Sequence, residues 1–157
     1  MKLKIYLDTN TVIDFFINEA RSLKKGEEPK IPKKFGFMAE KSSEIDFITS
    51  FITKAEIVRE LSSAFQLSNE EIEKLWDSFL KSIDCEYIDN FLFDEKIVKL
   101  ATGIRMRLRT MFNFMHVFIA MDKDAHFLSG DKDIINKIRE HKIYDKTLTY
   151  IELRKRF

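Results

Sequence analysis

The spacing of apolar residues changes abruptly near the start of the chain, from the period of a strand to that of a helix. Residues 3–7 alternate between two sets of side chains, as the two faces of a strand do, and this strand ends at Asp8. Apolar residues then recur at positions 12, 13, 15 and 16, the spacing of a helix's buried face, and the polar triplet 9–11 offers good caps for it. The opening of the chain therefore predicts a strand that runs directly into a helix.

The same change of period recurs along the rest of the chain. β-Branched, aromatic and other apolar residues predict four more strands, the last of them an edge strand, at residues 45–52, 85–88, 125–128 and 147–151. Apolar residues at helical spacing predict further helices at residues 53–65, 68–80, 93–108, 112–121 and 134–138. Alternating strands and helices indicate an α/β fold, and no repeat or internal linker interrupts residues 1–157, so we expect a single domain.

Two of the predicted helices begin with the sequence of a capping box. Thr53 is followed three residues later by Glu56, and Ser68 is followed in the same way by Glu71. In such a box the glutamate hydrogen-bonds back to the start of its own helix. Glu56 therefore has a purely structural explanation beside any functional one.

The segment between the first helix and the second strand is rich in lysine. Residues 21–36 hold both prolines and two of the four glycines, which predicts a loop, and residues 21–41 carry seven basic residues against three acidic ones. This basic insertion, at about 18–44, is either a solvated surface loop or a mobile arm that contacts phosphates. The candidate nucleic-acid contacts in it are Lys24, Lys25, Lys33 and Lys34.

Composition narrows the class of protein. With 45% hydrophobic residues and fifteen phenylalanines, 157 residues can bury a real core, while a net charge of +1 gives no overall signal for nucleic-acid binding. The single cysteine, Cys85, excludes an internal disulfide and a cysteine-rich zinc site, and the three histidines lack zinc-motif spacing. No apolar stretch reaches the roughly 18 residues of a membrane span. We expect a protein of the reducing cytoplasm, with no membrane partner.

Three acidic residues lie at or next to predicted junctions between strands and helices. Asp8 closes the first strand, Glu56 lies on the helix after the second strand, and Asp131 follows the strand at 125–128. In an open α/β sheet, ligands bind at the carboxyl ends of the strands, so these residues are candidates for a site. Each also has a simpler interpretation as part of a helix cap.

The buried helix at 112–121 contains two polar residues three positions apart, Asn113 and His116, which therefore share one face. A buried polar pair needs partners or a function, although a lone histidine is more often a satisfied core residue than a catalytic acid. Just before this helix, Arg105 and Arg109 lie at i, i+4. They are either phosphate contacts or ordinary cations near a helix end.

Three motifs taken together are similar to those of a known family: LDTN at 7–10, ITKAEIV at 52–58 and LSGDKD at 128–133. The chain resembles the PIN-domain ribonucleases, including the VapC-type toxins, from residue 3 to about residue 150. The resemblance implies a three-layer α/β/α sandwich with a mainly parallel central sheet. It also implies that Asp8, Glu56 and Asp131 form the catalytic acidic cluster, supported by Asn10 and Ser129.

One position departs from the family pattern, because Asn113 stands where the family has a further aspartate, with His116 next on the same face. The resemblance implies a Mg²⁺ or Mn²⁺ ion held by Asp8, Glu56, Asp131 and Asn113, and His116 as a further supporting residue. Converging carboxylates repel one another, and these cations favour hard oxygen ligands. Replacing a carboxylate by an amide removes one negative charge and weakens metal binding.

The resulting hypothesis is a metal-dependent endoribonuclease that hydrolyses RNA phosphodiester bonds. The alternative is a weakened or degenerate PIN domain that binds RNA or a protein, and a third interpretation is an unrelated α/β protein whose three acids are only helix caps. RNA is the expected partner. An antitoxin protein and a second copy of the chain are further candidates.

Overall fold

The computed structural model describes residues 1–91 and 108–157, apart from the side chains of residues 108–111. Each described strand is followed along the chain by one or two described helices, and all pairs of neighbouring strands are parallel. The strands are β1 Leu3–Leu7, β2 Ile45–Ser50, β3 Glu86–Ile88, β4 His126–Leu128 and β5 Thr147–Leu148. The helices are α1 Thr9–Lys25, α2 Lys33–Lys41, α3 Phe51–Phe65, α4 Asn69–Ser82, α6 Leu108–Asp122, α7 Lys132–Glu140 and α8 Tyr150–Arg154.

The strands form a five-stranded sheet in the order β3-β2-β1-β4-β5, with β1 at its centre. Ile5 of β1 lies opposite Phe47 of β2 and His126 of β4. The pairing continues beyond β1, where the Asp8 N–H donates to the Leu128 carbonyl at 3.1 Å. Because the strands are parallel, their carboxyl ends all meet at one edge of the sheet.

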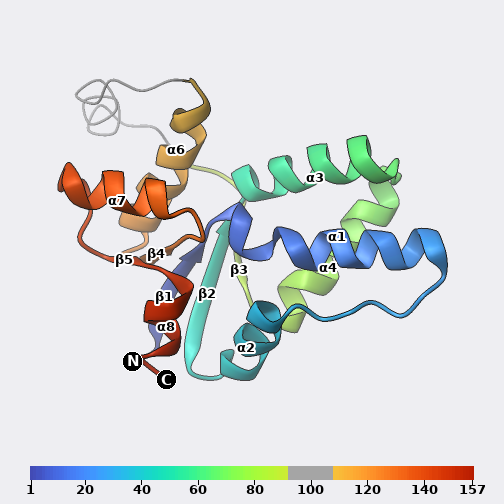
Figure 1. The fold of residues 1–157 in the computed structure, drawn as a ribbon, viewed down its shortest axis with the longest axis horizontal. Helices are drawn as coiled ribbons and strands as arrows, with labels where there is room; N and C mark the ends of the chain where they lie inside the picture. Colours follow the sequence, from blue (N-terminus) through green and yellow to red (C-terminus); the bar gives the residue numbers. More distant parts are fainter. Residues whose placement is uncertain (92–107) are drawn as a thin grey trace.

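Helices cover both faces of the sheet, so the described chain has the three layers that the sequence predicted (Figure 1). Ile5 and Leu7 point into an apolar core shared with α1, α3 and α4, whereas Tyr6 points into a second core shared with α6 and α7. The alternation read from residues 3–7 is therefore confirmed. Among the described residues, no helix combines the length and apolar composition that crossing a bilayer would need.

The junction between β2 and α3 differs from the prediction. β2 ends at Ser50, whose Oγ accepts the Ile52 N–H at 3.3 Å and caps α3, so Phe51 and Ile52 belong to the helix and not to the strand. Thr53 lies fully buried in the first turn of α3, and the predicted capping box of Thr53 and Glu56 is wrong. The physical reason is that Ser50 is itself a good cap. The second predicted box, Ser68 with Glu71, is confirmed at the start of α4.

The predicted loop at residues 21–36 is shorter in the structure. α1 continues to Lys25 and ends at Gly26, which adopts a left-handed conformation with φ of 67°. α2 begins after Pro32 and buries Phe35 and Met38. Only residues 26–32 of the predicted loop lie outside helices. The reason is that Gly26 ends α1 and Pro32 precedes the first turn of α2, so the break between the two helices is short.

The carboxyl-terminal part of the described chain also differs in detail. β5 is an edge strand as predicted, but it covers only Thr147–Leu148 and not residues 147–151. Thr149 and Glu152 form a capping box, which starts α8 where the strand was expected to continue. The predicted buried helix at 112–121 is confirmed within α6, and the predicted helix at 93–108 lies outside the described residues except for its last position.

Candidate active site

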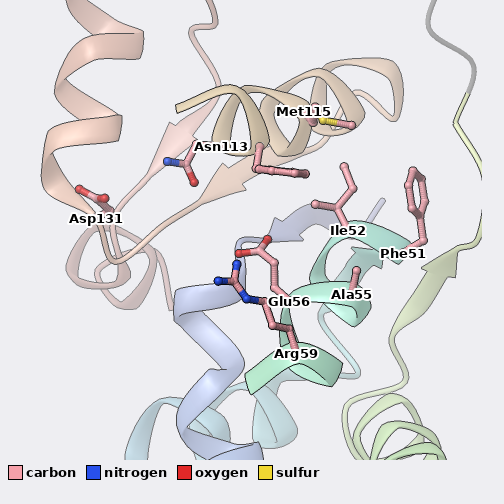
Figure 2. Close-up of a pocket in the computed structure, with 9 residues that line it drawn as sticks. Phe51, Ile52, Ala55, Glu56, Arg59, Asn113, Met115 and Asp131 are labelled. Atoms are coloured by element: carbon pink, nitrogen blue, oxygen red, sulfur yellow. The ribbon is translucent and has the colours of Figure 1, made fainter. Parts of the chain in front are cut away.

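The candidate site is a pocket of about 300 Å³ at the carboxyl ends of β1 and β4. These strands are neighbours, so the residue after β1, Asp8, and the loop after β4, which contains Asp131, reach the same edge of the sheet. Glu56 from α3 and Asn113 from α6 complete the set of predicted ligands that line the pocket. Figure 2 shows Glu56, Asn113 and Asp131 around one opening, each on a different element.

Asp8 is buried and held by donors that carry no charge. Its Oδ1 accepts the Thr9 N–H at 2.8 Å, and its Oδ2 accepts from Ser129 Oγ at 2.8 Å and from Asn10 Nδ2 at 3.1 Å. Burial raises the pKa of the Asp8 carboxyl above its ordinary value, and this effect is partly offset by His116 and Ser129. The fold thus fixes the orientation of a carboxylate whose charge it does not fully compensate.

Asn10 and Ser129, which the resemblance gave as supporting residues, lie in direct contact with each other and with Asp8. Asn10 Nδ2 donates to Ser129 Oγ at 3.1 Å, and Asn10 Oδ1 accepts the Gly130 N–H at 2.8 Å. Ser129 Oγ also accepts the Asp131 N–H at 3.1 Å. These bonds tie the loop after β4 to the start of α1, so the two aspartates are positioned by one connected set of hydrogen bonds.

His116 is the polar residue of α6 that contacts the acids. Its imidazole is fully buried, with Nε2 2.7 Å from Glu56 Oε1 and 3.7 Å from Asp8 Oδ1. On the other side of the ring, Nδ1 lies 2.6 Å from the Tyr6 hydroxyl. The sequence showed His116 only as a neighbour of Asn113. No local pattern in the sequence linked it to Tyr6, from which 110 positions separate it.

Glu56 faces the pocket and does not close a capping box. Its Oε1 accepts from Thr9 Oγ1 at 2.9 Å as well as from the imidazole of His116, while the side chain remains 42% exposed. Thr9, the residue after Asp8, is thus a contact of Glu56 that sequence reasoning saw only as a helix cap. The two predicted ligands Asp8 and Glu56 are linked through Thr9 and His116.

Asn113 and Asp131 lie further from these contacts. Asp131 caps α7, with Oδ1 accepting the N–H groups of Asp133 at 3.0 Å and Ile134 at 3.3 Å, so the simpler interpretation of this residue as a cap is confirmed. Asn113 is half-buried and lines the pocket. Within residues 1–91 and 108–157, no group of three or more His, Cys, Asp and Glu side chains is arranged to hold a metal ion.

These donors nevertheless fit one kind of metal binding. Mg²⁺ dehydrates reluctantly and is usually held by one or two carboxylates with several waters, and not by a cage of protein ligands. The pocket offers carboxylate oxygens from Asp8, Glu56 and Asp131 and an amide from Asn113 around about 300 Å³. Its chemistry suits a hydrated Mg²⁺ or Mn²⁺ ion.

The structure separates the lysines that were predicted to bind nucleic acid. Lys34, in the first turn of α2, brings its Nζ to 5.5 Å from the Tyr150 ring centroid and 3.9 Å from where a Cβ on Gly130 would lie. Lys24 and Lys25 lie in the last turn of α1, roughly 24 Å along the helix from Asp8 by the rise per residue.

Lys33 adjoins Lys34 on α2. Arg105 lies outside the described residues, as does the side chain of Arg109. Among the described basic residues, Lys34 brings its charged group beside the loop that carries Asp131.

A larger groove of about 700 Å³ opens next to the acidic pocket and shares Glu56, Asn113 and Asp131 with it. The rest of its wall is apolar except for the guanidinium of Arg59 (Figure 2). The apolar residues are Phe51, Ile52, Ala55, Phe112 and Met115. Phe112 is 53% exposed. Acidic and apolar surfaces thus adjoin at the ends of the strands.

The sequence matches no protein-family model and is similar in sequence to no curated protein. Among solved structures, the fold is similar to that in the crystal structure of VapBC2 from Rickettsia felis bound to a DNA fragment from their promoter. The TM-score is 0.50 at 15% identity, over 94% of this chain and 97% of that chain. At this identity the similarity establishes the fold and not the chemistry. With the parallel sheet and its two helical layers, it confirms the predicted PIN-like α/β/α architecture.

Proposed function

We propose that this protein is a PIN-type endoribonuclease that hydrolyses RNA phosphodiester bonds at the pocket of Asp8, Glu56 and Asp131, with a hydrated Mg²⁺ or Mn²⁺ ion. The observation that carries the proposal is that carboxylates from three separate elements, Asp8, Glu56 with Glu60, and Asp131, line one pocket at the carboxyl edge of a parallel sheet. That is the place where α/β folds bind ligands.

Asp8, Glu56 and Asp131, with the Asn113 amide, are the residues that would hold the cation. When bound, such an ion polarises a phosphate oxygen and lowers the pKa of an attacking water. The chain's own residues provide orientation: Ser129 and Asn10 fix the Asp8 carboxylate, and Thr9 and His116 fix Oε1 of Glu56. The Nζ of Lys34 lies beside Gly130, and we propose that it attracts a phosphate to the rim of the pocket.

Cleavage of a labelled single-stranded RNA by the purified protein tests this function. We expect product in Mg²⁺ or Mn²⁺, none in excess EDTA, and almost none from Asp8→Asn purified in the same way. Cleavage that persists in EDTA and in Asp8→Asn would show a contaminating nuclease and remove the support for the proposal.

A second candidate function is a degenerate PIN domain that binds RNA or a protein without cutting. The observation that favours it is the contact of His116 Nε2 with Glu56 Oε1 at 2.7 Å. A carboxylate that binds a metal ion would instead leave this oxygen free for the ion. Calorimetry with Mn²⁺ discriminates between the two candidates. If the protein shows no heat of Mn²⁺ binding and no RNA cleavage, the binding module is the better description.

We also propose a protein partner of the antitoxin type, because the resemblance to VapC-type toxins implies one and the groove beside the pocket offers an apolar wall with the exposed Phe112. Co-expression with the product of the adjacent gene should give a stable complex that Phe112→Ser weakens. A homodimer is the competing outcome, and light scattering of the isolated chain would reveal it.

A further inference from the structure

A chain of buried hydrogen bonds runs from the start of α3 to the acidic pocket. The Ser50 hydroxyl lies 2.6 Å from the Tyr6 hydroxyl, which lies 2.6 Å from His116 Nδ1, and His116 Nε2 lies 2.7 Å from Glu56 Oε1. Ser50, Tyr6 and His116 are each fully buried. The proposed reaction uses Glu56 but assigns no role to the two residues behind His116 in this chain.

The chemistry of each group sets the direction of these hydrogen bonds. An ionised carboxylate only accepts, so His116 Nε2 must carry the hydrogen that it shares with Glu56. In a neutral ring Nδ1 is then an acceptor, and the Tyr6 hydroxyl donates to it. The Tyr6 oxygen accepts in turn from Ser50, whose Oγ accepts the Ile52 N–H. In this arrangement the polar side-chain atoms of Ser50, Tyr6 and His116 all have partners.

Glu56 depends on this chain for its orientation. Its side chain is 42% exposed, and an exposed glutamate normally samples several rotamers. Here Oε1 is held from behind by the buried imidazole and from the side by Thr9 Oγ1. By donating to Nδ1, the Tyr6 hydroxyl favours the tautomer in which Nε2 carries the hydrogen and donates to Glu56.

We infer that Tyr6 and His116 are positioning residues for the reaction proposed above: they present the Glu56 carboxylate to the pocket through two consecutive hydrogen bonds. This inference rests on the proposed nuclease function. Neither residue touches the substrate in this scheme. Their removal should therefore slow the chemical step without weakening RNA binding.

The test is steady-state RNA cleavage by Tyr6→Phe, which removes one hydroxyl and leaves the ring in place. We expect kcat to fall about tenfold, the lower end of the effect of losing an outer-shell hydrogen bond, with KM unchanged. His116→Ala should lose more, and His116→Gln should recover part of that loss because its amide can also donate to Glu56. In His116→Gln the change Tyr6→Phe should have no further effect, because the ring that the hydroxyl oriented is gone.

Tyr144→Phe is the matched control, since its hydroxyl donates to the Ala125 carbonyl at 2.7 Å and has no contact with the pocket. Its kcat should equal that of the wild type. An unchanged kcat in Tyr6→Phe, or a fall in Tyr144→Phe of the same size, would overturn the inference.

A second measurement is independent of activity. Nitrogen NMR of ¹⁵N-histidine-labelled protein should show the His116 hydrogen on Nε2 in the wild type and a redistribution between the two nitrogens in Tyr6→Phe. A hydrogen on Nδ1 in the wild type overturns the inference even if the protein cleaves RNA. A wild type that cleaves no RNA overturns the proposed function instead, and the NMR result still decides whether the ring donates to Glu56.

Discussion

The two faces of the sheet are buried in different ways. On the face of α1 and α4 the interior is aromatic: Phe79 packs with ring centroids 5.1 Å from Phe16 and 5.5 Å from Trp76. On the face of α6, the rings of Tyr6 and His116 are equally buried, but their polar atoms are joined into a hydrogen-bonded chain that ends at Glu56.

This difference separates stability from function. An aromatic cluster needs only matching volumes, so its removal costs packing energy and leaves a cavity. A buried polar chain needs each donor to meet its acceptor, so deletion of one atom reorganises the whole chain. We therefore expect large stability effects on the first face and large activity effects on the second.

Phe79→Ala should give the largest loss of stability. Phe79 is fully buried, and truncation of such a ring lowers the free energy of unfolding by about 3–5 kcal/mol. Urea denaturation measures the change. Leu23→Ala is the control, because Leu23 is 53% exposed and should change stability by less than about 0.5 kcal/mol. Equal losses in the two variants would contradict the assignment of the aromatic core.

Asp8→Asn should give the largest loss of activity. The substitution keeps the size of the side chain and removes its charge, so we expect RNA cleavage to fall by at least about 100-fold while the fold persists. Single-turnover cleavage measures the fall, and circular dichroism checks the fold. Cleavage within a few fold of wild type would mean that the acidic pocket is not where the reaction occurs.

The position of His116 sharpens a prediction about metal binding. Its ring, and not Asn113, stands between the carboxylates of Asp8 and Glu56. His116→Asp should therefore gather three carboxylates and raise Mn²⁺ affinity about tenfold or more, whereas Asn113→Asp should raise it less. Calorimetric titration with Mn²⁺ compares the two variants. A larger gain in Asn113→Asp would show that the ion is centred nearer Asn113 than the Asp8 and Glu56 pair.

The pH dependence of stability should reflect the burial of Asp8. Its raised pKa means that the native state binds this proton more tightly than the unfolded chain does. Its contribution is therefore greatest below the ordinary carboxyl pKa and declines as the pH rises through the folded-state value. Urea midpoints in EDTA from about pH 3 to pH 8 should thus decline for the wild type relative to Asp8→Asn. Parallel curves would show that the proton affinity of Asp8 is the same in both states.

Lys34→Gln should give the smallest effect. Loss of one phosphate contact to a single strand should reduce the slope of log affinity against log salt by about 0.7. Lys24→Gln is the matched control, because it removes the same charge from the far end of α1. Fluorescence titration of RNA at several salt concentrations measures both slopes. An equal change of slope in the two variants would show that Lys34 acts only as general surface charge and makes no specific phosphate contact.

The sequence predicted the elements of this fold well where a local signal marks a boundary. Examples are the change of apolar period at Asp8, where α1 starts, and the capping residue Ser68, where α4 starts. The prediction failed at the start of α3, where both Ser50 and Thr53 could cap the helix. Ser50 is the cap in the structure, and Phe51 and Ile52 then pack against the second core from the first turn of α3. Competition of this kind is resolved by packing and not by propensity.

Part of the candidate site was also within reach of the sequence, since Asp8 and Asp131 each lie between a strand and the helix that follows it, and the two strands are neighbours in one parallel sheet. The bond between Tyr6 and His116 was not, because 110 positions separate the two residues and no local pattern refers one to the other. The sequence analysis placed residues 3–7 on the two faces of a strand and His116 beside Asn113, and neither pattern joined Tyr6 to His116.

The placement of β1 at the centre of the sheet has a consequence for synthesis. During translation Ser129, which donates to the Asp8 carboxylate, follows Asp8 by 121 positions. At about 5–20 residues per second the chain needs roughly 6–24 s to supply it. A nascent copy of this protein therefore carries Asp8 with only its nearest partners, Thr9 and Asn10, and Ser129 completes the orientation of the carboxylate only once β4 has been translated.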